Sequence, residues 1–133
     1  MTRKEARKFM MHTLYQMDLS KDFNVDNHDD YFKNVDLGGQ KEYCENLYSI
    51  MCNKKDEIDG LLSSFSKKWP LARMLKTDLA ILRLATIEIL YFNSIPDSVS
   101  ANEAVELAKI YGEDESSSYI NAILANVIKS KAL

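Results

Sequence analysis

Four basic residues crowd the first eight positions of the chain: Arg3, Lys4, Arg7 and Lys8, with Glu5 as the only acid among them. Cations at the start of a helix oppose the helix dipole, so local stability does not require this arrangement. Their functional interpretation is contact with phosphates, and the alternative is a basic face that is simply solvated. Because the net charge is −3, any nucleic-acid site must be a local patch.

Residues that could support catalysis or bind a metal lack the necessary partners. Glu103 and Glu106 lie three positions apart, as paired carboxylates do, but the first fits a capping box and the second a solvated position. His12 and His28 have no second ligand at metal spacing. The sequence also has no glycine-rich phosphate loop and no HExxH or GxSxG motif. It therefore predicts a binding protein without catalytic residues, cofactor or metal.

Length and composition predict one helical domain over residues 1–133. Glycine and proline are scarce, with 4 and 2 residues, which favours helices over a turn-rich β fold. Cys44 and Cys52 are the only cysteines, and on one helix they would lie about 12 Å apart along the axis. This separation is too large for a disulfide, so we expect free thiols in a reducing cytoplasm.

The central stretch LKTDLAILRLATIEILYF, from Leu75 to Phe92, is apolar on every side of a helix. A helix of this kind is buried among other helices, and this one is too short and too often charged to span a membrane. Arg83 in its middle needs a carboxylate or carbonyl partner, and we expect a carboxylate of a neighbouring helix, for which Glu103 is the candidate. We therefore predict an all-α fold, a bundle of about seven helices around this buried helix.

Capping and periodicity predict the first half of the bundle. Thr2 and Glu5 have the spacing of a capping box, so the first helix begins almost at the start of the chain. A short helix is expected around 29–34 and a long one over 41–66, in which Gly60 either bends or only weakens the helix. The apolar stripe of the first helix consists of Ala6, Met10, Leu14 and Met17.

Similar signals predict the second half. Trp69-Pro70 breaks the long helix, and Ser100 with Glu103 has the spacing of a second capping box. Gly112 ends the helix that follows, and Ser116 begins the last one. The apolar stripe of the last helix consists of Ile120, Ile123, Leu124, Val127 and Ile128.

Three stretches together resemble the NusB transcription antitermination family. They are ARKFMMHTLYQMDLS from Ala6, ILRLATIEIL from Ile81, and ANEAVELAKIYG from Ala101 running into YINAIL at Tyr119. They cover nearly the whole chain in the order of the family, and their combination is specific. The resemblance implies an all-α domain of two packed helical subbundles.

The resemblance also implies a function and partners. Members bind a short single-stranded boxA-type element in nascent transcripts, typically ribosomal RNA leaders. They act with NusE, a small-subunit ribosomal protein, in a complex on RNA polymerase that suppresses premature termination. No reaction is catalysed, and no cofactor is required.

Carried over to this sequence, the basic segment of the family falls on Arg3, Lys4, Arg7 and Lys8. Tyr15, Glu115 and Tyr119 match further positions of the RNA surface, and Asp78 matches an acidic position that faces NusE. An aromatic side chain there can stack on an unpaired base. Tyr15 and Tyr119 have an alternative role as half-buried core residues. If the chain binds RNA in this way, these groups should form one continuous surface.

A second function remains open. NusB-like domains also occur in front of RNA cytosine methyltransferases, so the chain could be a related protein-interaction module without RNA activity of its own. An apolar face left uncovered in the monomer would indicate a homodimer.

Overall fold

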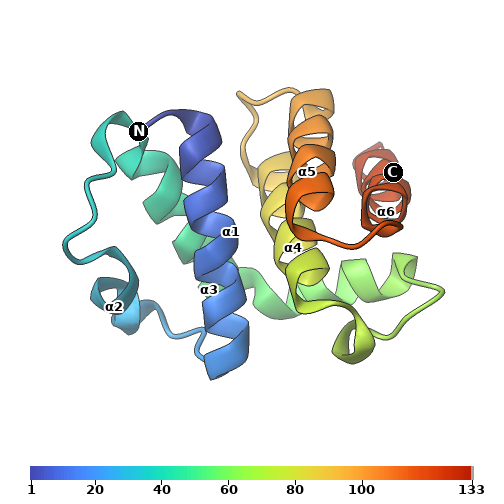
Figure 1. Ribbon diagram of the computed structural model, residues 1–133, viewed down its shortest axis with the longest axis horizontal. Helices are drawn as coiled ribbons and strands as arrows, with labels where there is room; N and C mark the ends of the chain where they lie inside the picture. The colour runs from blue at the N-terminus through green and yellow to red at the C-terminus, as the bar shows by residue number, and fades with distance from the viewer. Residues whose placement is uncertain (133) are drawn as a thin grey trace.

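The predicted central helix is α4 (Lys76–Tyr91) in the computed structural model, which describes residues 1–132. It contacts four other helices, so α4 is the axis of the fold (Figure 1). Every residue from Asp78 to Ile89 is buried, as the apolar character of the whole stretch predicts.

The described part of the chain contains six α-helices, three short 3₁₀ segments and no strand. The all-α prediction is confirmed, and the expected count of about seven helices becomes six. The other α-helices are α1 (Arg3–Ser20), α2 (His28–Phe32), α3 (Lys41–Phe65), α5 (Asp97–Tyr111) and α6 (Ser116–Ser130). The 3₁₀ segments are η1 (Val25–Asn27), η2 (Gly38–Gln40) and η3 (Leu71–Arg73).

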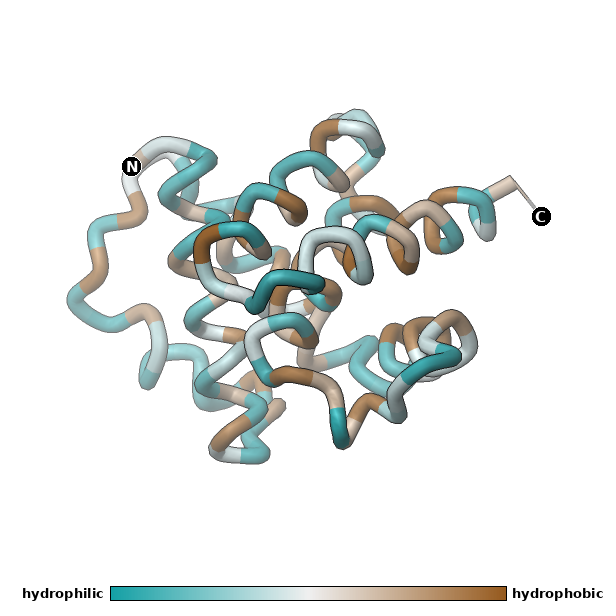
Figure 2. The backbone as a smooth tube through the Cα atoms, turned by 45° about the vertical axis from the view of Figure 1, so that its right-hand side comes forward, coloured by the Kyte–Doolittle hydropathy of each residue, from teal (hydrophilic) through white to brown (hydrophobic). Residues whose placement is uncertain are grey.

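The helices bury their apolar stripes in one connected core. Ala6, Met10, Leu14 and Met17 of α1 are completely buried, and the predicted stripe of α6 is buried except for the half-buried Ile128. Along the helices, brown hydrophobic residues alternate with teal hydrophilic ones (Figure 2). Across residues 1–132, no helix combines the length and the apolar character that a membrane crossing requires.

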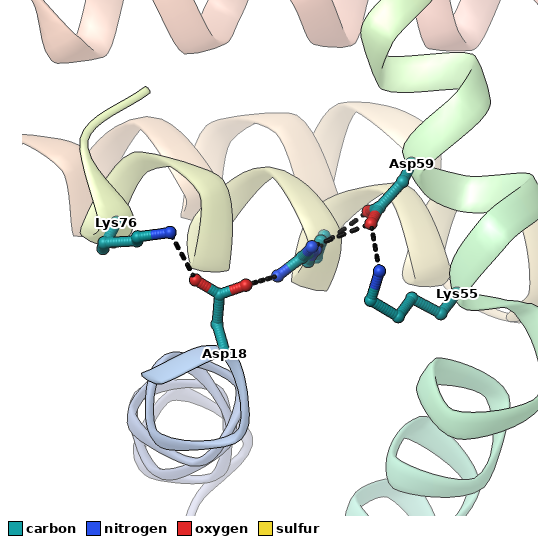
Figure 3. Close-up of polar contacts among 5 residues, drawn as sticks. Asp18, Lys55, Asp59 and Lys76 are labelled. Atoms are coloured by element: carbon teal, nitrogen blue, oxygen red, sulfur yellow. Dashed lines mark hydrogen bonds and ion pairs between the residues drawn. The ribbon is translucent and has the colours of Figure 1, made fainter. Parts of the chain in front are cut away.

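Two local predictions are wrong, the Ser100 cap and the Glu103 partner of Arg83, and one open alternative is decided. Helix α5 begins at Asp97, so Ser100 lies inside this helix and does not cap it. The Ser100 hydroxyl instead donates to Glu88 Oε1 at 2.8 Å. Helix α3 bends at Lys54, whose backbone angles are not helical, so of the two roles left open for Gly60 the bend is not observed. Arg83 does pair with carboxylates, but the partners are Asp18 and Asp59 and not Glu103 (Figure 3).

Both cysteines lie on α3 and are free thiols, as predicted. Cys44 is buried and Cys52 is half-buried. Burial raises the pKa of the Cys44 thiol to about 11, so this group is a neutral core side chain at physiological pH.

Candidate nucleic-acid interface

Helix α1 begins at the predicted capping box. The Thr2 hydroxyl accepts from the Glu5 backbone N–H at 3.1 Å, and the Glu5 carboxylate accepts from the Thr2 N–H at 2.8 Å. These hydrogen bonds lower the pKa of Glu5. Glu5, the only acid among these basic residues, therefore stabilises the start of the helix and does not form an ion pair with Lys4 or Lys8.

One side of α1 carries residues that face outward along its whole length. Lys4, Lys8, His12, Tyr15 and Leu19 follow one another at intervals of three or four positions, which places them on one side of a helix. We call this set the α1 face. All of its members are exposed except Tyr15, which is half-buried. Lys4 and Lys8 lie about 6 Å apart along the axis.

The four predicted cations differ in exposure. Lys4 and Lys8 are exposed, and Lys4 makes only a long ion pair, with its Nζ 3.7 Å from Glu103 Oε2. A pair of this kind at the surface contributes little. Arg3 is half-buried, with its guanidinium 4.3 Å from the centre of the Tyr43 ring.

Arg7 has a different place from the one the sequence suggests. It is 6% exposed, and its Nε and Nη2 donate to the two carboxylate oxygens of Glu88 at 2.8 and 3.0 Å. Burial opposes the charge of Arg7, but the hydrogen bonds and charge of Glu88 outweigh it and the pKa is raised. Its planar fork is occupied by Glu88, so Arg7 acts as a residue that positions α1 against α4.

A slot opens beside the α1 face, between α1 and α5. It has a volume of about 190 Å³ and is lined by Met11, His12, Tyr15, Thr77 and Tyr111. The ring of His12 meets that of Tyr111 edge to face, with centroids 5.3 Å apart. Burial and the nearby Lys8 charge lower the pKa of His12, so its imidazole is neutral at pH 7. The slot offers aromatic surfaces directly beyond the two lysines.

Of the five residues that line this slot, the sequence predicted only Tyr15 as a site residue, and two of the others carry aromatic rings. His12 could have been found from its spacing, four positions after Lys8 and three before Tyr15. Tyr111 gave no such signal, because it comes from the end of α5 and reaches α1 only through the fold.

Asp78, Glu115 and Tyr119 meet at a second pocket, of about 350 Å³, between the first turn of α4 and the start of α6. Trp69 and Leu75 line its rim and are exposed. The pocket lies beyond the end of α1, since Asp18 near that end pairs with Lys76 at the start of α4. The cations at the start of α1 are therefore not next to Tyr119, and Tyr15 lies between the two regions.

Asp78 is 6% exposed, so it does not stand out from the surface as a free contact. Its Oδ2 accepts from the Ser116 hydroxyl at 3.1 Å, and this hydroxyl accepts from the Glu113 N–H at 2.9 Å. Gly112 makes this turn possible, because a Cβ there would lie 2.5 Å from Ser116 Cβ. Asp78 thus ties the first turn of α4 to the start of α6.

At pH 7, the variant Asp78→Asn is expected to be as stable as the parent protein or more stable by ~1 kcal/mol. Burial raises the pKa of Asp78, against the Ser116 hydrogen bond and with help from the Glu113 charge. Stability from a group of raised pKa is complete below its unfolded pKa and is lost as the pH rises toward the folded one. Asparagine keeps the acceptor and carries no charge.

Urea unfolding of both proteins between pH 4 and 7 measures this effect. The advantage of Asp78→Asn should shrink as the pH falls toward 4. A variant that is less stable than the parent at pH 7 would contradict the prediction.

Comparison with known proteins points to one family. Residues 4–129 match the NusB family. The chain is 40% identical to the transcription antitermination protein NusB of Alkaliphilus oremlandii, over 100% of this chain and 97% of that protein. NusB of Acetivibrio thermocellus is also 40% identical, over 100% of this chain and 92% of that protein.

Two solved structures have the same fold. NusB of T. maritima is 29% identical and superposes with a TM-score of 0.86, over 97% of this chain and 92% of that one. A chain in the crystal structure of a plectonemic RNA supercoil gives a TM-score of 0.83, over 98% of this chain and 96% of that one. Its identity is 23%, so this likeness concerns the fold alone.

Proposed function

Because this chain belongs to the NusB family of non-enzymatic transcription antitermination factors, we propose that it binds a boxA-type single-stranded element of nascent ribosomal RNA transcripts. In this proposal it acts with the ribosomal protein NusE in a complex on RNA polymerase and helps the polymerase to read through terminators. The observation that carries the RNA part is the α1 face.

The α1 face combines the two groups that an unpaired strand requires. Lys4 and Lys8 are exposed on successive turns, and each ammonium group can contact one phosphate. Tyr15 and Tyr111 line the slot that follows, where an unpaired base can stack on an aromatic ring. A duplex does not offer its bases in this way, so the arrangement favours a single strand.

NusE is the proposed partner at the second pocket. The exposed Trp69 and Leu75 provide apolar contact area there, and the buried Oδ1 of Asp78 has no hydrogen-bond partner within residues 1–132. A donor from the partner could satisfy this oxygen. Glu115 and Tyr119 line the same pocket, so we propose that they contact the partner or the RNA close to it.

Salt dependence of RNA binding tests the proposal. With Lys4, Lys8 and Arg3 as phosphate contacts, the slope of log affinity against log salt should be about −2, from roughly −0.7 per contact. Affinity should then fall about twenty-fold between 50 and 200 mM salt, by the same rule. A fluorescence titration of a boxA-like RNA, with a scrambled RNA of equal length beside it, measures both affinity and specificity.

Two double variants make the titration specific. Lys4→Ala/Lys8→Ala should reduce the slope to about −0.7, because one contact remains. The matched control Lys54→Ala/Lys129→Ala removes two exposed charges from α3 and α6 and should leave the slope unchanged. A flat salt response of the parent, or equal binding of the scrambled RNA, would favour the protein-interaction module instead.

A further inference from the structure

A third cavity, of about 360 Å³, lies where the start of α1, the start of α3 and the end of α4 meet. We call it the end pocket. It lies at the opposite end of α4 from Asp78 and was not indicated by any sequence motif. Its walls include the half-buried rings of Tyr91 and Phe92 and the buried ring of Tyr43.

Arg3 is fixed at this pocket by two contacts. Its Nε donates to Gln40 Oε1 at 2.5 Å, and its guanidinium lies over the Tyr43 ring. Tyr43 is itself held from behind, since its hydroxyl donates to Glu88 Oε2 at 2.6 Å. The two terminal nitrogens of Arg3 make no hydrogen bond to any residue from 1 to 132, so they remain available to a phosphate.

Four exposed polar side chains also line the pocket: Ser94 and the three that carry a carboxylate or an amide, Glu42, Asn46 and Asn93. None of them makes a side-chain hydrogen bond or ion pair in the described part of the chain. A carboxylate and two amide oxygens accept hydrogen bonds, and the amides donate as well. Such groups pair with the exocyclic amino groups of adenine and cytosine, which uracil lacks.

We propose that the end pocket binds one unpaired nucleobase that carries an exocyclic amino group. Aromatic walls suit the faces of the base, the amides and Glu42 suit its edge, and Arg3 suits the adjoining phosphate. Arg3 precedes Lys4 in the chain, so the pocket continues the path of the α1 face around the start of α1. This inference rests on the proposed RNA function and extends its footprint by one nucleotide.

The test compares a boxA-like RNA with the same RNA extended by one adenosine or one uridine at either end. At one of the two ends, adenosine should tighten binding about tenfold, in keeping with the contribution of one stacked base. Uridine should give a clearly smaller gain. Asn46→Ala/Asn93→Ala should abolish the difference between the two extensions, and the control Asn126→Ala, on the exposed side of α6, should keep it.

Two results would overturn the inference. One is an equal effect of adenosine and uridine at both ends, and the other is an unchanged preference in Asn46→Ala/Asn93→Ala. Both leave the proposed function intact, because that is judged by the unextended RNA against its scrambled form.

A second readout applies if no RNA binds. NMR titration of the whole chain with adenosine monophosphate should then move the side-chain amide signals of Asn46 and Asn93, and uridine monophosphate should move them less. Inorganic phosphate is the control for charge alone. The absence of movement with adenosine monophosphate would overturn the inference on its own.

Discussion

Glu88→Ala is expected to lower the free energy of unfolding by ~4 kcal/mol, because it leaves the buried cation of Arg7 without its counter-charge. Glu88 is 1% exposed, in the last turn of α4. It also accepts from the hydroxyls of Tyr43 and Ser100, at 2.6 and 2.8 Å. The variant therefore leaves the Arg7 cation and two buried hydroxyls without their common acceptor. Urea unfolding measures the loss as a lower midpoint with an unchanged slope.

Since ~4 kcal/mol is a large part of the stability of an ordinary domain, a milder variant accompanies this one. Glu88→Gln keeps the side-chain size and an acceptor for one hydroxyl and should cost ~2–3 kcal/mol. Arg7→Met/Glu88→Leu removes both charges and should recover the part of the loss that comes from the unpaired cation, because a buried ion pair is often replaceable by apolar side chains. The part that comes from the hydroxyls of Tyr43 and Ser100 should remain, because leucine offers no acceptor. A loss below ~1 kcal/mol in Glu88→Ala would show that Arg7 finds another partner.

The same double variant separates the fold of α1 from its RNA contacts. Arg7 is neutralised by Glu88 inside the protein, so it should contribute nothing to phosphate binding. Arg7→Met/Glu88→Leu should therefore bind RNA with the salt slope of the parent. A slope reduced by one contact would instead assign Arg7 to the RNA surface.

The helices were predictable because their signals are local. The capping box of Thr2 with Glu5, the break at Trp69-Pro70 and the apolar stripes each involve residues within one or two turns of one another. Ser100 shows the limit of such signals. It has the spacing of a cap with Glu103, but its hydroxyl is used by Glu88 of another helix.

The candidate site was predictable only where one helix supplies it. Lys4, Lys8 and Tyr15 share one face of α1, which the sequence can show. The partners of Arg3 and Arg7 lie 37 and 81 positions away, and nothing in their neighbourhood indicates these contacts. The four basic residues therefore look alike in the sequence, although burial divides them into exposed, half-buried and buried groups.

A second buried network surrounds Arg83, whose guanidinium lies between carboxylates from α1 and α3 (Figure 3). Its Nε and Nη2 donate to the two oxygens of Asp59 at 2.9 and 2.8 Å, and its Nη1 donates to Asp18 at 2.9 Å. Lys76 Nζ and Lys55 Nζ each lie 3.0 Å from an oxygen of these carboxylates. Arg83 of α4 thus forms ion pairs with both α1 and α3.

Arg83→Met is expected to cost ~3 kcal/mol at pH 7, measured by urea unfolding, because two largely buried carboxylates lose their shared partner. The two lysines moderate the loss. Arg83→Met/Asp18→Asn/Asp59→Asn removes the unpaired charges as well and should be more stable than Arg83→Met alone. A triple variant that is no more stable would mean that lost packing, and not charge, explains the effect.

The pH dependence distinguishes these two causes further. In the parent, burial opposes the charge of Asp18, but the hydrogen bonds from Arg83 and Lys76 outweigh it and lower the pKa. A lowered pKa contributes stability that is present above the unfolded pKa and is lost as the pH falls through the folded one. Without Arg83 this contribution shrinks, so the parent should lose its advantage over Arg83→Met as the pH falls from about 5 to about 2. Equal costs at both pH values would assign the effect to packing, because the volume of a side chain does not titrate.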